Sequence, residues 1–195
     1  MRQDALLTEL VDSILTHRHL ERYPHVYYLR DRMVAKGYVR IEDALQNYEW
    51  GRSLIDAGIK VPRSYAVIEP EKIKPMTKGW SLNEKKFEYW YFIMQKIEGE
   101  ATGTLRGEER DRAEELLAGE IRKVLKLDII PDDCFYGGNS IYNRKEDQTY
   151  LIDFGFWERC SPDSEDKESI LKKLSVPGWL VDDIPREKIS CDHQI

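Results

Sequence analysis

The chain has 195 residues, of which 41% are hydrophobic, 11% aromatic and 34% charged. This composition excludes a disordered polyelectrolyte and predicts a globular protein that can bury a sizeable core. The formal net charge of −6 gives no general support for nucleic-acid binding. No apolar run approaches the roughly eighteen residues of a membrane helix, and the N-terminus lacks a signal-peptide core, so we expect a cytoplasmic protein.

The N-terminal part of the chain predicts a helix followed by an antiparallel hairpin. Apolar residues recur at i, i+3 and i+4 spacing over 4–15, which predicts an amphipathic helix that packs on a sheet. Two strand-like runs follow at 25–29 and 33–39, and the polar pair between them is typical of a tight turn. The second run contains Lys36.

The middle of the chain returns to a helical pattern and then to strands. Helical periodicity covers 41–57, and Gly58 is placed to end this helix. A β segment at 65–68 is followed by a polar loop over 69–86. The run 89–97 is the strongest strand prediction because it is rich in aromatic and apolar residues.

The C-terminal part predicts a long helix and a second hairpin. Apolar residues on one side of 108–127 predict the helix. Apolar runs at 141–142 and 150–152 are separated by a polar segment of hairpin length. Asn139 precedes the first run and Asp153 follows the second, so the hairpin brings both side chains to one end. Because Mg²⁺ takes one or two protein oxygens and leaves its other positions to phosphate and water, this pair is a candidate magnesium site.

Several segments resemble the protein kinase-like superfamily. Asn139 and the Asp-Phe-Gly at 153–155 resemble its metal-binding pair, the catalytic-loop Asn and the Asp of the DFG motif. The helix 41–57 followed by GIKVP resembles the αC helix and the entry to the fourth strand in the RIO, Bud32 and aminoglycoside phosphotransferase group. FIMQKIEGE resembles the hinge of that group, and SEDKESILKKL resembles a segment of Bud32.

The resemblance implies an α+β, bilobal protein kinase-like fold of minimal size. Its N-lobe would cover 1–97, with an N-terminal helix, an antiparallel sheet and the αC-like helix 41–57. Its reduced C-lobe would cover 98–195, with the long helix 108–127, a catalytic and metal-binding hairpin over 128–156, and a tail. No glycine-rich loop signature precedes Lys36, and too few residues follow the DFG motif for a full kinase C-lobe.

The resemblance also implies an ATP-binding site. Lys36 matches the lysine that contacts the phosphates, and Glu49 matches the glutamate that orients it. Arg30 is an alternative phosphate contact, because the stretch LRDRMVAKGY also resembles Bud32. Backbone groups of the hinge would hold the adenine ring, which implies roles for Met94, Gln95, Lys96 and Ile97.

The catalytic base is the position at which the sequence departs from the family. The family places this aspartate five residues before the metal-binding Asn, and Cys134 occupies that position. Asp133 is the nearest candidate and Asp132 the next. The glycines before Asn139 permit unusual backbone angles that would restore the geometry.

The function favoured by the sequence is an ATP- and Mg²⁺-dependent phosphotransferase, specifically a minimal serine/threonine protein kinase. Asp133 would accept the proton of the hydroxyl group, while Asn139 and Asp153 hold the metal. One alternative is a pseudokinase or nucleotide-binding scaffold, favoured by the missing His-Arg-Asp and glycine-rich loop. Another is a Bud32-like ATPase in a tRNA-modifying assembly, and a lesser one is a small-molecule phosphotransferase. The partners expected are ATP and a protein substrate, with no membrane and with nucleic acid contacted only through such an assembly.

Overall fold

The computed structural model describes residues 3–16, 19–20, 23–30, 32–73 and 89–181. The chain forms two compact units, a first unit of Met1–Ile97 with Asp153–Gly155 and a second unit of Glu98–Ile152 with Phe156–Ile195. Most of the polar loop predicted over 69–86 and the last part of the predicted tail, 182–195, lie outside the described residues. None of the helices in the described part of the chain is both long enough and apolar enough to cross a membrane.

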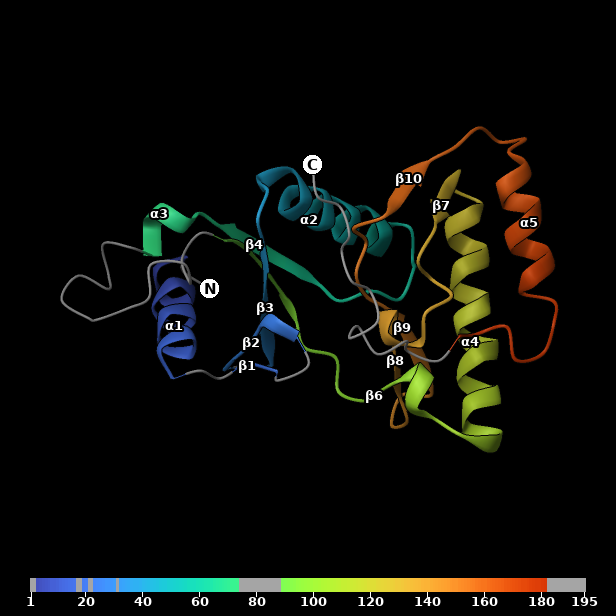
Figure 1. Cartoon of the computed structure of the whole chain (residues 1–195), viewed down its shortest axis with the longest axis horizontal. Coiled ribbons are helices and arrows are strands. Elements are labelled where there is room, and N and C mark those ends of the chain that lie inside the picture. The colour runs from blue at the N-terminus through green and yellow to red at the C-terminus, as the bar shows by residue number, and fades with distance from the viewer. Residues whose placement is uncertain (1–2, 17–18, 21–22, 31, 74–88, 182–195) are drawn as a thin grey trace, which may run out of the picture. The chain divides into compact units, whose positions relative to one another are not determined.

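The first unit is built on a five-stranded sheet whose paired strands are all antiparallel (Figure 1). In spatial order its strands are β1 (His19–Leu20), β2 (Tyr23–Leu29), β3 (Met33–Tyr38), β5 (Trp90–Gln95) and β4 (Ser64–Ile68). The turn between β2 and β3 is tight, because Arg32 adopts a φ of 59° and the Met33 amide donates to the Arg30 carbonyl at 3.2 Å. The predicted hairpin is therefore confirmed.

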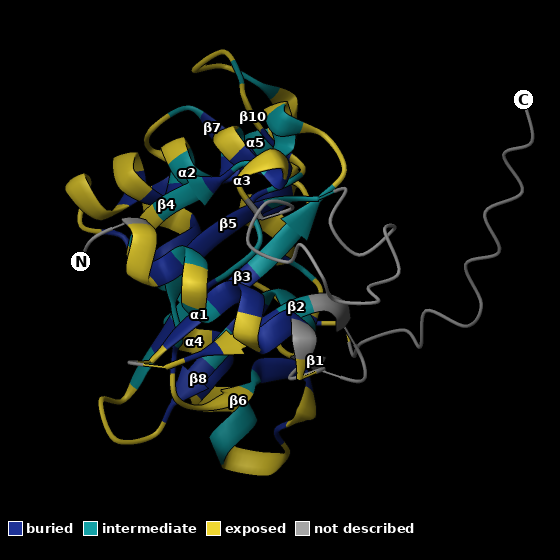
Figure 2. Cartoon of the chain, turned by 90° about the vertical axis from the view of Figure 1, so that its left-hand side faces the viewer, coloured by how far each residue is buried: buried dark blue, intermediate teal, exposed yellow. Residues whose placement is uncertain are grey.

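Helix α1 (Gln3–Leu15) covers one face of this sheet, as its apolar spacing predicts. Its buried side chains share a core with the strand residues Met33, Ala35, Tyr91 and Ile93. Figure 2 shows β5 as buried over much of its length, as expected of a central strand.

Helix α2 (Ile41–Asp56) covers the opposite face. Side chains alternate along a strand, so Lys36 and Phe92, which lie opposite each other in register, point away from α1. There the Phe92 ring makes an edge contact with Tyr48 of α2, at 6.5 Å between ring centroids. Lys36 therefore lies on the α2 side of the sheet.

The end of α2 follows the glycine signal in the sequence. Gly58 adopts a φ of 74°, and its amide donates to the Ile55 carbonyl at 2.9 Å. The Ile59 amide donates to the Leu54 carbonyl, also at 2.9 Å. These two bonds form a Schellman motif, which satisfies carbonyls that the helix would leave without partners. After β4 the chain adds the short helix α3 (Pro70–Ile73).

The second unit combines two helices with two small sheets (Figure 1). A three-stranded sheet has the order β6-β8-β9, and β7 pairs antiparallel with β10. The elements are β6 (Glu100–Ala101), η3 (Thr102–Thr104), α4 (Gly107–Leu125), β7 (Ile129–Pro131), η4 (Gly137–Asn139), β8 (Ser140–Asn143), β9 (Gln148–Leu151), β10 (Trp157–Arg159) and α5 (Glu165–Lys173). Together with the first unit, these antiparallel sheets and helices confirm the predicted α+β class.

Helix α4 anchors the β8–β9 hairpin. The buried Thr149 hydroxyl of β9 donates to the Ala113 carbonyl of α4 at 3.1 Å, and Ala113 packs in a cluster with Leu105 and Tyr142. The turn η4, which ends at Asn139, approaches η3 closely, because a Cβ on Gly137 would lie 2.2 Å from the Gly103 Cα. Only glycine fits at Gly137 without moving the backbone, so this contact fixes where β8 begins.

Candidate functional site

The first unit brings Lys36 and Asp153 into contact. The Lys36 Nζ lies 2.5 Å from the Asp153 Oδ2, and the two side chains are 22% and 25% exposed. The ammonium also lies 5.1 Å above the centre of the Tyr38 ring. A cation and a carboxylate, 117 residues apart in sequence, are thus held together at a partly open position. A lysine can bind phosphate oxygens, and a carboxylate can bind a metal ion.

The backbone turns sharply at Asp153. Strand β9 ends at Leu151, and Asp153 adopts a φ of 66°. Gly155, two residues later, lies outside the left-handed region, so the aspartate takes the unusual angle itself. A residue other than glycine in this conformation costs energy that the surrounding structure must supply, and such residues concentrate at functional sites.

Asn47 of α2 supports this turn. Its Oδ1 accepts a hydrogen bond of 3.0 Å from the Phe154 amide, and its Nδ2 donates to the Asp43 carbonyl at 2.8 Å. Asn47 and Phe154 are both 1% exposed. The peptide after Asp153 is therefore fixed by a buried side chain from a helix more than a hundred residues away in sequence.

Glu49 is not placed as the sequence suggested. The buried positions of α2 recur every three or four residues, at Ala44, Asn47, Gly51 and Leu54. Glu49 follows Asn47 by two residues, which corresponds to about 200° around the helix, so it lies on the exposed face. Lys36 pairs with Asp153 instead. The expected pair of Lys36 with Glu49 is thus replaced, because the face of α2 that meets the sheet carries an asparagine.

Arg30, the alternative phosphate contact, lies exposed at the end of β2 beside the hairpin turn. Its backbone amide donates to the Glu9 carboxylate of α1. Of the two cationic candidates, Lys36 is the one that contacts Asp153.

The predicted hinge lies at the end of β5. Met94 lies opposite Val34 in register, on the same face of the sheet as Lys36. The Gln95 amide donates to the Arg63 carbonyl at 2.8 Å, and the Lys96 amide donates to the Arg32 carbonyl at 2.6 Å. These two donors are used within the fold. Among the described residues no backbone carbonyl accepts a hydrogen bond from the Ile97 amide.

The second unit brings Asp133, Asn139 and Trp157 together. The Asn139 Nδ2 donates to the Asp133 carbonyl and to its Oδ2, both at 3.0 Å. The Trp157 indole Nε1 donates to the other carboxylate oxygen, Oδ1, at 3.0 Å. Both contacts of the amide nitrogen are to acceptors, which fixes the orientation of the Asn139 side chain.

The three candidates for the catalytic base in the loop before Asn139, which are two carboxylates and one thiol, differ in how far they are buried. Asp133 is 8% exposed, whereas Asp132 is exposed. Cys134, which stands at the position of the family's base, is 2% exposed. Burial raises the pKa of the Cys134 thiol far above its usual value, and the negative charge of Asp133 adds to this shift. The thiol is therefore protonated at neutral pH and unsuited to act as a base or nucleophile.

The two clusters are connected through the β8–β9 hairpin. At its open end the Ile152 amide donates to the Asn139 carbonyl at 2.9 Å, and Asp153 is the next residue in the chain. In the described part of the chain no three His, Cys, Asp or Glu side chains gather as a metal site. Within the first unit, the carboxylate of Asp153 is the kind of oxygen ligand that suits Mg²⁺ in the presence of phosphate, and it suits zinc or copper poorly.

Sequence reasoning missed Asn47 and Trp157. Asn47 could have been recognised as the one polar residue on the apolar stripe of its helix. Trp157 follows the DFG motif closely, but a tryptophan in a short strand reads as core, and its indole donor has no sequence signature.

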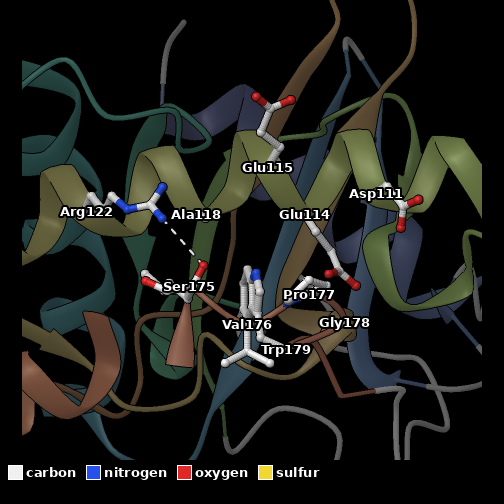
Figure 3. A pocket seen from close by; sticks show the side chains of 11 residues that line it. Asp111, Glu114, Glu115, Ala118, Arg122, Ser175, Val176, Pro177, Gly178 and Trp179 are labelled. Atoms are coloured by element: carbon white, nitrogen blue, oxygen red, sulfur yellow. Dashed lines mark hydrogen bonds between the residues drawn. The ribbon is translucent and has the colours of Figure 1, made fainter. Parts of the chain in front are cut away.

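A separate pocket of about 300 Å³ lies beside α4 in the second unit (Figure 3). It is bounded by α4 and by the segment that follows α5, with Trp179 and the acidic side chains of Asp111, Glu114 and Glu115 along its wall. Glu114 is already paired with Arg110 at 2.8 Å. None of the residues described above as site candidates lines this pocket.

No protein-family model matches the sequence, and no curated protein matches it. The fold, however, is similar to structures of WbdD, a bifunctional kinase-methyltransferase. A medium-resolution structure of WbdD shares 18% identity at a TM-score of 0.51, and a 2.2 Å structure shares 14% at 0.52, each over 80% of this chain. A complex of WbdD with a kinase inhibitor shares 17% identity at a TM-score of 0.50 over 78%. The shared feature is the fold. The matched part is 35–36% of the WbdD chain, so this chain spans about a third of that protein.

Proposed function

We propose that this chain is a minimal kinase-type phosphotransferase that transfers the γ-phosphoryl group of ATP to a hydroxyl group in the presence of Mg²⁺. The observation that carries the proposal is the contact of Lys36 with Asp153, the aspartate of the DFG motif, at 2.5 Å. WbdD, which has a similar fold, is both a kinase and a methyltransferase, and the contact of Lys36 with Asp153 favours the kinase activity for this chain. In this interpretation the first unit is the N-lobe and the second is a reduced C-lobe.

Lys36 and the hinge hold the nucleotide in this scheme. The Lys36 ammonium binds phosphate oxygens, for which a flexible point charge is well suited. The Ile97 amide donates to the adenine ring in this scheme, and Met94 and Val34 lie on the sheet face from which Lys36 projects. The carboxylate of Asp153 and the Oδ1 of Asn139 hold Mg²⁺, which neutralises charge on the phosphates.

Asp133 is the general base of the proposed reaction. Its carboxylate accepts the proton of the acceptor hydroxyl as that oxygen bonds to the γ-phosphorus and the bond to the β-phosphate oxygen breaks, releasing ADP. Asn139 and Trp157 each donate to one oxygen of the Asp133 carboxylate. These two donors fix the direction in which Asp133 faces. A serine or threonine side chain of a protein is the acceptor that the family resemblance favours.

A nucleotide-binding scaffold is the second candidate. It is favoured by the exposed Glu49 and by the separation of six residues, instead of five, between Asp133 and Asn139. A scaffold would bind ATP but would not turn it over.

The test measures nucleotide binding with and without Mg²⁺, and then phosphoryl transfer to a mixed peptide library and to water. Asp153→Asn is expected to abolish transfer while the protein remains folded, because a metal-binding carboxylate is held for its charge. Asp133→Ala is expected to lower kcat by about 10²-fold or more with little change in nucleotide affinity. The matched control is Asp132→Ala, which removes an exposed carboxylate one residue away. Binding without turnover would favour the scaffold, and hydrolysis without peptide transfer would favour an ATPase.

A further inference from the structure

The buried side-chain amide of Asn47 is unusual for its position in α2. The other buried positions on this face are Ala44, Gly51 and Leu54, which carry small or apolar side chains. Burying an amide is costly unless its hydrogen bonds are satisfied. Both ends of the Asn47 amide have partners of unambiguous type, since the Asp43 carbonyl can only accept and the Phe154 amide can only donate. The orientation of the side chain is therefore determined by its neighbours.

The Phe154 end of this contact acts on Asp153. The Phe154 N–H lies in the peptide plane that joins it to Asp153, so fixing this N–H fixes how the plane is rotated about the Asp153 Cα. Asp153 has the left-handed φ of 66°, which a residue other than glycine keeps only when its surroundings hold it there. Lys36 holds the carboxylate and Asn47 holds the backbone.

The neighbourhood of Asn47 is shaped for this contact. A Cβ on Gly51, one turn along the same face, would lie 3.6 Å from the Phe154 ring and 2.2 Å from the Ser64 Oγ. A larger residue at Gly51 would force the Ser64 hydroxyl of β4 to move. The small residue thus lets α2 approach the sheet and the Phe154 ring closely enough for Asn47 to reach the backbone.

We propose that Asn47 is a positioning residue for metal binding, which holds Asp153 in its ligating conformation through the Phe154 amide. This inference rests on the proposed function and deepens it. It assigns to a buried amide of α2 a contact with the metal-binding loop, whereas the sequence had led us to expect this helix to orient Lys36 through Glu49.

The test is a calorimetric titration of Mg²⁺ into the protein saturated with a non-hydrolysable ATP analogue. Asn47→Leu keeps the approximate volume and removes the acceptor. We expect it to weaken Mg²⁺ binding by about 10- to 100-fold, as is usual when a group that orients a metal ligand is lost, and to leave metal-free nucleotide binding within about threefold of wild type. Leu54→Ala is the matched control, because it damages the same buried face of α2 without touching the Phe154 amide. It should lower the melting temperature and leave Mg²⁺ affinity unchanged.

Equal Mg²⁺ affinity in wild type and Asn47→Leu would overturn the inference, as would an equal loss in Leu54→Ala. Amide hydrogen exchange of the metal-free wild type tests the same contact without a variant. The Phe154 amide should exchange at least about 10²-fold more slowly than an exposed loop amide, and fast exchange would overturn the inference even if Asn47→Leu does not fold. A wild-type protein that binds neither the nucleotide nor Mg²⁺, with Phe154 still protected, would refute the proposed function instead.

Discussion

The hydrogen bond from Trp157 to Asp133 allows a quantitative test of how the proposed base is held. The indole Nε1 and the carboxylate Oδ1 are 3.0 Å apart, and the two residues are 2% and 8% exposed. Trp157→Phe removes the donor and replaces the indole by a smaller ring. Loss of a hydrogen bond to a charged group costs roughly 1.5–3 kcal/mol, and the smaller ring adds about 0.5–1 kcal/mol. We therefore expect a loss of roughly 2–4 kcal/mol in the free energy of unfolding.

The assay is a double-mutant cycle that combines Trp157→Phe with Asp133→Ala. Unfolding in denaturant is monitored by circular dichroism, because removing Trp157 changes the fluorescence of the protein. A loss of 2–4 kcal/mol corresponds to a fall of roughly 4–16 °C in melting temperature for a chain of this size. The double variant should be more stable than the sum of the single effects predicts, by about 1–2 kcal/mol. The contact of Asp133 with Asn139 is absent from both the Asp133→Ala variant and the double variant, so its loss cancels from the coupling energy. Additivity within about 0.5 kcal/mol would refute the argument that the indole holds the carboxylate.

Two further predictions concern the nucleotide lysine and the turn before Asn139. Lys36→Met should weaken ATP binding or turnover by at least about tenfold. Arg30→Met changes an exposed residue at the hairpin turn and should have less than about a twofold effect. The reverse order of effects would mean that the phosphate contact has been assigned to the wrong residue. Gly137→Ala should destabilise the protein by more than about 2 kcal/mol and lower turnover, because its Cβ would lie 2.2 Å from the Gly103 Cα. The control is Gly119→Ala inside α4, where nothing lies within 4 Å of the added Cβ, and it should be neutral or stabilise the protein by up to about 1 kcal/mol. Similar melting temperatures for the Gly137→Ala and Gly119→Ala variants would contradict the close approach of η4 to η3.

The sequence predicted the elements of the fold well where the signal was local and periodic. The helix α2, its end at Gly58, the hairpin of β2 with β3, and the hairpin of β8 with β9 all follow from spacing and turn chemistry. Each of these signals arises within a few residues, where the period of the side chains and the backbone freedom of glycine decide the outcome.

The arrangement of the site could be predicted only in part, because hydrogen bonds between distant segments leave no local pattern. The pairing of Lys36 with Asp153 depends on the face from which each side chain leaves its element, whereas the family resemblance paired Lys36 with Glu49. On α2 a shift of two residues separates the buried Asn47 from the exposed Glu49. The donor role of Trp157 depends on the pairing of β10 with β7. This pairing sets Trp157 opposite Pro131 and so places the indole beside Asp133, two residues after Pro131.

The segment Asp153–Gly155 groups with the first unit although the chain on both sides of it belongs to the second. Three peptide bonds therefore join the units, after Ile97, after Ile152 and after Gly155. A fragment cut after Ile97 would lose the carboxylate that neutralises Lys36 and the amide that satisfies Asn47, and would open the site that Phe154 fills. The N-terminal unit is thus not a module that can be excised or exchanged as one continuous stretch of gene, and truncation, fusion and domain-swap designs must carry the hairpin that returns Asp153 to it.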